Sequence, residues 1–154
     1  MIFIHGLDSS SQGTKARFFR GKYEKILTPD FRGDLAERLD RLEDVLAGKK
    51  NIILVGSSFG GLMATIYGLN HPKTVKKLVL LAPALNFQEF AAWKGKRTDI
   101  PASLFIGRHD TVTLPEPVTE AARATFTNLT IDLLDDDHLL HKTYRQIDWQ
   151  NLLI

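Results

Sequence analysis

Short apolar runs alternate with polar, helix-forming stretches along the whole chain. Runs of β-forming residues predict six strands, at residues 1–5, 24–27, 52–55, 77–81, 102–106 and 129–134. Helical patterns separate them, at residues 15–20, 34–47, 116–125 and 139–149 and after residue 58 up to His71-Pro72. The apolar runs read as buried parallel strands. The alternation therefore predicts an α/β fold, a three-layer sandwich whose mainly parallel six-stranded sheet carries helices on both faces.

Composition narrows the class of protein. The 154 residues suit one domain, residues 1–154, and a net charge of +2 argues against nucleic acid or an anionic membrane as partner. The absence of cysteine excludes disulfides, thiolate metal sites and a cysteine nucleophile. No segment has the pattern of a membrane span or of a signal peptide, so a cytoplasmic location is the default expectation. The oligomeric state stays open between monomer and homodimer, although a short second strand flanked by Lys25 and Pro29 argues against pairing of two copies through that edge.

The central apolar run leads into a G-x-S-x-G motif. Ile52 to Val55 are followed by Gly56-Ser57-Ser58-Phe59-Gly60 and then by a helical pattern, which is the context of a nucleophile elbow. A sharp strand-to-helix turn leaves no room for a Cβ two positions before or after the serine. Gly56 and Gly60 therefore select Ser58 as the nucleophile. The alternative is a glycine- and serine-rich turn that serves packing alone.

A serine nucleophile needs a base, and His138 is the strongest candidate. It directly follows the last predicted strand, which places it at the same sheet edge as Ser58. The alternative is a surface histidine beside an acidic run. His141 is the main competitor, but it is expected inside the terminal helix. His5 is expected to shape a loop. His71 is expected to face solvent, and His109 is expected to point away from the site.

The acid that orients the base is expected at Asp110, in the loop that Gly107 opens after the fifth strand. Asn86 and Glu89 are weaker alternatives, and residues 135–137 are expected to form a solvated turn. Two backbone N–H groups should stabilise the oxyanion. We expect them to come from Phe59, next to the nucleophile, and from Leu7, in the turn that follows His5 and Gly6.

Together these residues resemble the α/β-hydrolase superfamily. The matching features are His5-Gly6, the elbow, Gly107 to Asp110 and the final His138, in the order serine, acid, histidine. The opening HGLDSSSQGTKA is most similar to small compact esterases. The superfamily usually has two strands before the HG loop, so the resemblance implies a truncated fold with strand order 2-1-3-4-5-6. A proline often found after the acid loop is replaced by Leu114.

The resemblance implies a serine esterase that cleaves small or short-acyl carboxylic esters through an acyl-enzyme, with neither a metal nor a cofactor. Its partner would be a small-molecule ester, in a site without a large lid. An apolar rim is expected from Leu7, Phe59, Leu85, Phe87 and Leu139. Three alternatives stay open: a thioesterase or cofactor-free perhydrolase with the same triad, a non-catalytic binding module, and a phosphate binder. A phosphate-binding loop would need the sequence G-K-[ST] after Gly60, and this chain does not have it.

Overall fold

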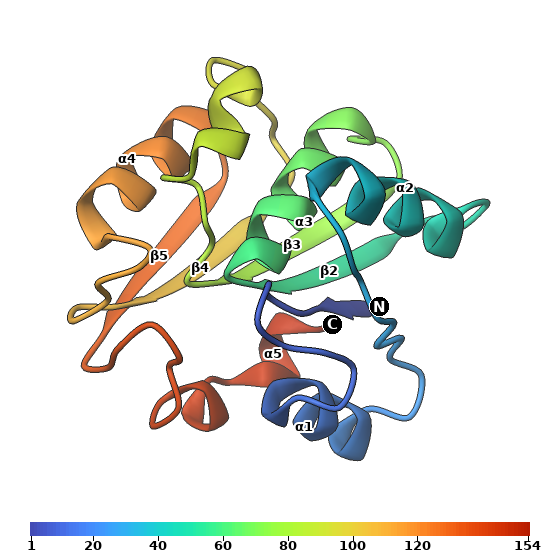
Figure 1. Cartoon of the computed structure of the whole chain (residues 1–154), viewed down its shortest axis with the longest axis horizontal. Helices are drawn as coiled ribbons and strands as arrows, with labels where there is room; N and C mark the ends of the chain where they lie inside the picture. The colour runs from blue at the N-terminus through green and yellow to red at the C-terminus, as the bar shows by residue number, and fades with distance from the viewer.

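A computed structural model describes residues 1–154 and contains one five-stranded, wholly parallel sheet (Figure 1). The strands follow one another across the sheet in chain order. They are β1 (Ile2–Ile4), β2 (Ile52–Ser57), β3 (Val75–Leu81), β4 (Ala102–Gly107) and β5 (Leu129–Leu134). Of the six predicted strands, the one at residues 24–27 is wrong. The other five strands have the expected relative order.

Residues 24–27 form a single bridge instead of a strand. Leu27 pairs with Ile2 alone, and the Phe3 amide donates to the Leu27 carbonyl at 2.8 Å. The ladder cannot extend far in the C-terminal direction, because Pro29 has no amide hydrogen to donate. Leu27 is therefore a contact at the sheet edge, and its side chain is 40% exposed.

Helices cover both faces of the sheet, as the alternating pattern predicts (Figure 1). Three helices pack on one face around a 26-residue core: α2 (Leu35–Leu46), α3 (Phe59–Asn70) and α4 (Pro115–Thr125). On the other face, α1 (Thr14–Lys22) and the short α5 (Trp149–Leu152) enclose a 12-residue core. In that smaller core, the Phe19 and Trp149 rings pack edge to face with their centroids 4.8 Å apart.

Helix α2 shows how the sequence sets an element. The Asp34 carboxylate accepts from the Glu37 amide at 2.9 Å, and the Glu37 carboxylate accepts from the Asp34 amide at 2.8 Å. This capping box fixes the first turn. Leu42 and Leu46 then bury one face of the helix. The turn at residues 47–51, which joins α2 to β2, lies at the amino end of β2.

The C-terminal part departs from the prediction. Residues 139–149 do not form one helix. They contain turns and a 3₁₀ segment, η2 (Tyr144–Gln146), before α5 begins. Leu140 has a φ of +50°, which an α-helix cannot accommodate. The amides of Lys142 and Thr143 donate to the Asp136 carboxylate, and the Thr143 amide also donates to the Leu140 carbonyl, three residues earlier. Neither makes the bond to the carbonyl four residues earlier that an α-helix requires. Similarly, the segment after β3 forms a 3₁₀ helix, η1 (Gln88–Trp93).

The parallel topology brings the carboxyl ends of all five strands to one edge, where ligands bind in such sheets. The loops that follow β1, β2, β4 and β5 carry the predicted site residues. None of the helices combines the length and apolar character that crossing a bilayer requires.

Candidate active site

Ser58 lies on the strained turn between β2 and α3. Its φ of +54° and ψ of −117° are rare for a residue with a side chain. The flanking glycines are required by close packing. A Cβ on Gly56 would lie 2.4 Å from the Gly60 carbonyl oxygen, and a Cβ on Gly60 would lie 2.0 Å from the Ile4 carbonyl oxygen. The lack of a side chain at Gly56 thus allows the tight turn to form, whereas the lack of one at Gly60 lets α3 approach β1.

His138, in the loop after β5, bridges Ser58 and Asp110. Its Nε2 lies 3.0 Å from Ser58 Oγ, and its Nδ1 lies 2.8 Å from Asp110 Oδ2. An ionised carboxylate can only accept, so Nδ1 carries the hydrogen and Nε2 accepts from the serine hydroxyl. The Asp110 side chain is fully buried, and that of His138 is 19% exposed. In such an arrangement an imidazole can accept the proton of a serine hydroxyl.

The Asp110 carboxylate is held by its own loop. Oδ1 accepts from the amides of Val112 and Thr113, at 2.9 and 2.8 Å, and Oδ2 accepts from Thr113 Oγ1 at 2.6 Å. Burial raises the pKa of Asp110, but the hydrogen bonds from His138, Thr113 and Val112 lower it more, so its pKa lies below the ordinary value. The carboxylate therefore stays ionised beside the imidazole.

Thr113 is a site residue that the sequence analysis missed. It is fully buried, and its Oγ1 lies 3.1 Å from His138 Nδ1 as well as beside Asp110. The available signal was a threonine three residues after an aspartate, a spacing that suits a local side-chain-to-backbone turn. Of the alternative acids, Asn86 donates to the Val112 carbonyl at 3.2 Å and Glu89 is exposed.

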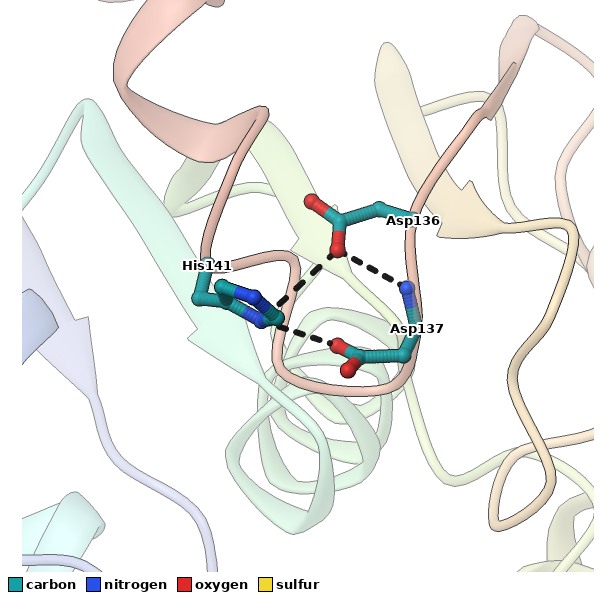
Figure 2. A group of neighbouring side chains, drawn as sticks. All are labelled: Asp136, Asp137 and His141. Atoms are coloured by element: carbon teal, nitrogen blue, oxygen red, sulfur yellow. Dashed lines mark hydrogen bonds and ion pairs between the residues drawn. The ribbon is translucent and has the colours of Figure 1, made fainter.

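The loop that carries His138 is organised by Asp136 (Figure 2). Its Oδ2 accepts from the Lys142 amide at 3.0 Å and from the Thr143 amide and hydroxyl, both at 2.9 Å. Its Oδ1 accepts from the Asp137 amide at 2.8 Å. Burial raises the pKa of Asp136, but these hydrogen bonds outweigh it and the pKa is lowered. The expectation of a wholly solvated turn is wrong for Asp136, which is 3% exposed.

His141 contacts the carboxylates of Asp136 and Asp137 (Figure 2). Its Nδ1 lies 3.2 Å from Asp137 Oδ1 and 3.8 Å from Asp136 Oδ1. The ligand atoms of these three residues lie within 4.8 Å of one another, close enough to hold a metal ion. Both Asp136 oxygens, however, already accept hydrogen bonds from the loop. We therefore assign the cluster to holding the loop that carries His138.

The two amides expected to stabilise an oxyanion are those of Phe59 and Leu7. Phe59 begins α3, and Leu7 lies in the loop after β1. Neither amide donates among the loop, turn and cap hydrogen bonds. The Leu7 loop is fixed by His5, which is 2% exposed. His5 Nε2 accepts from the Phe31 amide at 3.0 Å, so its Nδ1 donates to the Gly6 carbonyl at 2.7 Å.

His71 and His109 lie outside the site. His71 contacts Glu43 at 2.6 Å, and the exposed His109 contacts Asp135 at 3.0 Å. Burial lowers the pKa of His5, with Arg38 adding to that effect and the Gly6 carbonyl and Asp30 opposing it. His5 is therefore held neutral, as its hydrogen bonds require.

A pocket of about 380 Å³ opens beside Ser58 and His138. Leu7, Phe87 and Leu139 line it as expected, and Val112 lines it in addition. The rim prediction is wrong for two side chains. Phe59 is 2% exposed and Leu85 is fully buried, and both belong to the larger core.

The fold and the grouping of these side chains define an α/β hydrolase. The chain belongs to this family, because a family model described as "alpha/beta hydrolase fold" matches residues 4–97. Over 51 residues the chain is 41% identical to the pimeloyl-[acyl-carrier protein] methyl ester esterase of Vibrio cholerae serotype O1. That match covers 33% of this chain and 20% of the esterase, so the chain spans about a fifth of this curated relative.

Solved structures share the fold at low identity. A predicted CIB-like hydrolase from Thermoplasma acidophilum has a TM-score of 0.74 at 22% identity, over 91% of this chain and 77% of its own. The monoacylglycerol lipase of Paleococcus ferrophilus has a TM-score of 0.73 at 16% identity, over 92% and 86%. Est1E from Butyrivibrio proteoclasticus has a TM-score of 0.74 at 17% identity, over 89% and 78%.

Proposed function

We propose that this protein is a serine esterase that cleaves small or short-acyl carboxylic esters through an acyl-enzyme. The observation that carries the proposal is the chain of contacts from Ser58 Oγ to His138 to the Asp110 carboxylate, at 3.0 and 2.8 Å. A histidine held by a buried carboxylate is the arrangement that activates a serine hydroxyl. The name of the partial relative from Vibrio cholerae, a methyl ester esterase, agrees with ester cleavage.

The reaction follows from these groups. His138 Nε2 removes the hydroxyl proton while Ser58 Oγ attacks the ester carbonyl, and Asp110 stabilises the resulting imidazolium. The amides of Leu7 and Phe59 donate to the oxyanion. His138 then gives its proton to the departing alcohol. Water, deprotonated by His138, attacks the acyl-enzyme carbonyl, and the bond to Ser58 Oγ then breaks while His138 returns the proton to that oxygen, which releases the carboxylic acid.

The pocket supports the proposed substrate size. A volume of about 380 Å³ lies near the small end of ligand sites, which run from about 300 to 1,000 Å³. The side chains of Leu7 and Leu139 are 45% and 60% exposed. Such a mouth suits a short apolar acyl or alkyl group and provides no enclosed channel for a long chain.

Replacing Ser58 with alanine tests the proposal. We expect turnover of a short-acyl activated ester to fall on the order of a millionfold, as in other serine triads. A fluorophosphonate probe should label the unaltered protein at Ser58, as peptide mapping would show, and should not label Ser58→Ala. The neighbouring Ser57→Ala serves as the matched control and should keep labelling. Esterase activity that survives in Ser58→Ala would exclude Ser58 as the nucleophile.

A further inference from the structure

The two outer edges of the sheet differ. The edge at β1 is closed, because the Leu27 amide donates to the Met1 carbonyl at 3.1 Å and the Leu27 carbonyl accepts from the Phe3 amide. The edge at β5 is open, because only β4 pairs with this strand (Figure 1). Proteins protect an open edge with proline, lysine or a β-bulge. The six residues of β5, LTIDLL, contain none of these, and their register with β4 is continuous.

The backbone groups of β5 that have no partner lie on alternate residues. The Asn128 and Leu134 carbonyls accept from the amides of Ala102 and Arg108, at 2.9 and 2.8 Å, so the even-numbered residues bond toward β4. Backbone groups alternate in direction along a strand. The odd-numbered residues therefore point their N–H and C=O groups out of the sheet edge: Leu129, Ile131 and Leu133.

The side chains of β5 are arranged symmetrically about Ile131. Leu129 and Leu133 lie two residues away on either side and share the face of Ile131, which packs toward α4. Thr130 and Asp132 flank Ile131 on the opposite face, and both are exposed. A second copy that runs antiparallel and is centred on Ile131 would therefore place leucine opposite leucine and the Thr130 hydroxyl opposite the Asp132 carboxylate.

Other registers fit less well. If the pair were centred on Asp132, the two carboxylates would lie directly opposite each other, which destabilises a sheet. If it were centred on Thr130, Leu133 would lie opposite Thr127, beyond the end of the strand, and its backbone groups would lose their partner. The register centred on Ile131 satisfies the odd-numbered groups of both copies and avoids the like charges.

A groove beside β5 suits the leucine that such a copy would bring. It has a volume of about 420 Å³, and its lining includes Phe126, Leu129 and Ile131. The Leu133 side chain is 45% exposed in the single chain. In the register centred on Ile131, Leu133 of the second copy lies opposite Leu129, at this groove. Each copy would thus cover the exposed leucine of the other, which favours association.

We propose that β5 is a self-association edge, through which two copies of this chain pair antiparallel about Ile131 and join their sheets into one. The odd-numbered residues of both copies would make about six hydrogen bonds across the contact. One strand and one groove make a small interface, so the dimer should be reversible, with a dissociation constant on the order of 10 to 100 μM. This inference does not depend on the proposed esterase function, and its tests need no substrate.

The first test combines sedimentation velocity, from about 1 to 500 μM protein, with amide hydrogen exchange followed by NMR at both ends of that range. We expect monomers at the low end and dimers at the high end. In the dimer, the amides of Leu129, Ile131 and Leu133 should exchange at least about threefold more slowly than in the monomer. A protein that stays monomeric throughout, or a dimer in which these amides exchange as fast as before, would overturn the proposal.

Charge variants test the register. Thr130→Asp would place a second carboxylate opposite Asp132 and should weaken the dimer about fivefold, whereas Thr130→Lys should strengthen it about fivefold. Combining Thr130→Asp with Asp132→Lys places opposite charges together again and should restore the dimer. Thr111→Asp, at an exposed position outside β5, makes the same change in charge and should leave the dimer unaltered. Equal weakening in Thr111→Asp, or no recovery in the double variant, contradicts pairing about Ile131.

Discussion

Ser58 and His138 meet at 3.0 Å, but different forces hold the two segments that carry them. At the elbow, backbone packs directly against backbone. Gly60 lets α3 approach the Ile4 carbonyl more closely than any side chain would allow. In the loop after β5, side-chain hydrogen bonds converge on the buried carboxylate of Asp136. Ser58 is thus positioned by steric fit and His138 by polar contacts.

This difference determines how each segment can fail. Steric fit is indifferent to pH and intolerant of added volume. A hydrogen-bonded carboxylate tolerates modest changes in shape, but it depends on its ionised state. The two segments should therefore respond differently to the same kinds of perturbation, and substitutions can test each one separately.

The largest effect should come from enlarging Gly60. The added methyl group of Gly60→Ala would meet the Ile4 and His5 carbonyl groups at 2.0 to 2.8 Å, and backbone cannot move aside cheaply. We expect the free energy of unfolding to fall by about 3 kcal/mol or more, the upper end of overpacking. Urea denaturation followed by circular dichroism measures this change.

Gly21→Ala is the matched control. Gly21 lies in α1, and open space extends for 4 Å around the position that an added methyl group would take. Helix propensity alone should therefore raise the stability of this variant by about 1 kcal/mol. Equal stability of the two alanine variants would show that close packing does not fix the elbow.

Asp136→Asn should have the next largest effect. The asparagine amide group would face N–H donors that now meet a carboxylate, which leaves buried donors unpaired. We expect a loss of about 2 kcal/mol in the free energy of unfolding. Hydrolysis should slow as well, because His138 loses its fixed loop. Asp135→Asn, in which the replaced side chain is 91% exposed, should change neither quantity.

Acid should weaken the loop before it affects the elbow. The pKa values of Asp110 and Asp136 are lowered in the folded state, so each carboxylate stabilises the fold above its unfolded-state pKa. That contribution is lost as the pH falls from about 4 through the lower folded-state values. Unfolding measured from pH 7 to pH 2 should show this loss. It should be smaller in Asp136→Asn, and an identical pH dependence in both proteins would contradict the role of Asp136.

The smallest effect is expected from Thr113→Val. Valine keeps the volume of threonine but removes the hydroxyl that donates to Asp110 Oδ2 at 2.6 Å. The unfolding free energy should fall by about 1 kcal/mol, and kcat should fall several-fold because the carboxylate loses one restraint. Thr111→Val, at an exposed position of the same loop, is the control. Unchanged unfolding and kcat in Thr113→Val would remove Thr113 from the site.

Local sequence was sufficient to predict the segments that depend on local rules. The spacing of leucines in α2 is encoded within its own residues, and the G-x-S-x-G spacing describes the steric demand of the elbow. The grouping of His138 with Asp110 follows from topology, since both residues follow neighbouring parallel strands at one edge. Their roles in catalysis stay predictions until Ser58→Ala is measured.

The predictions failed where contacts between residues far apart in the sequence determine the structure. Residues 139–149 have helical spacing of apolar residues, but the Asp136 carboxylate takes the amides of Lys142 and Thr143 that a helix would use. Phe59 was expected at the rim, but the direction of α3 turns its side chain into the core. The importance of Thr113 depends on its approach to His138, 25 residues further along the chain, which no local pattern contains.

A chain break in the turn between α2 and β2 would divide the residues of the site unequally between two fragments. This turn lies at the end of β2 remote from Ser58, and a break there separates residues 1–48 from residues 49–154. The first part contains Leu7 and the edge strand β1, whereas the second contains Ser58, Asp110 and His138. Neither part holds both expected oxyanion donors. Ester cleavage by two such fragments would therefore report their reassembly, which makes this turn a natural place to build a split reporter.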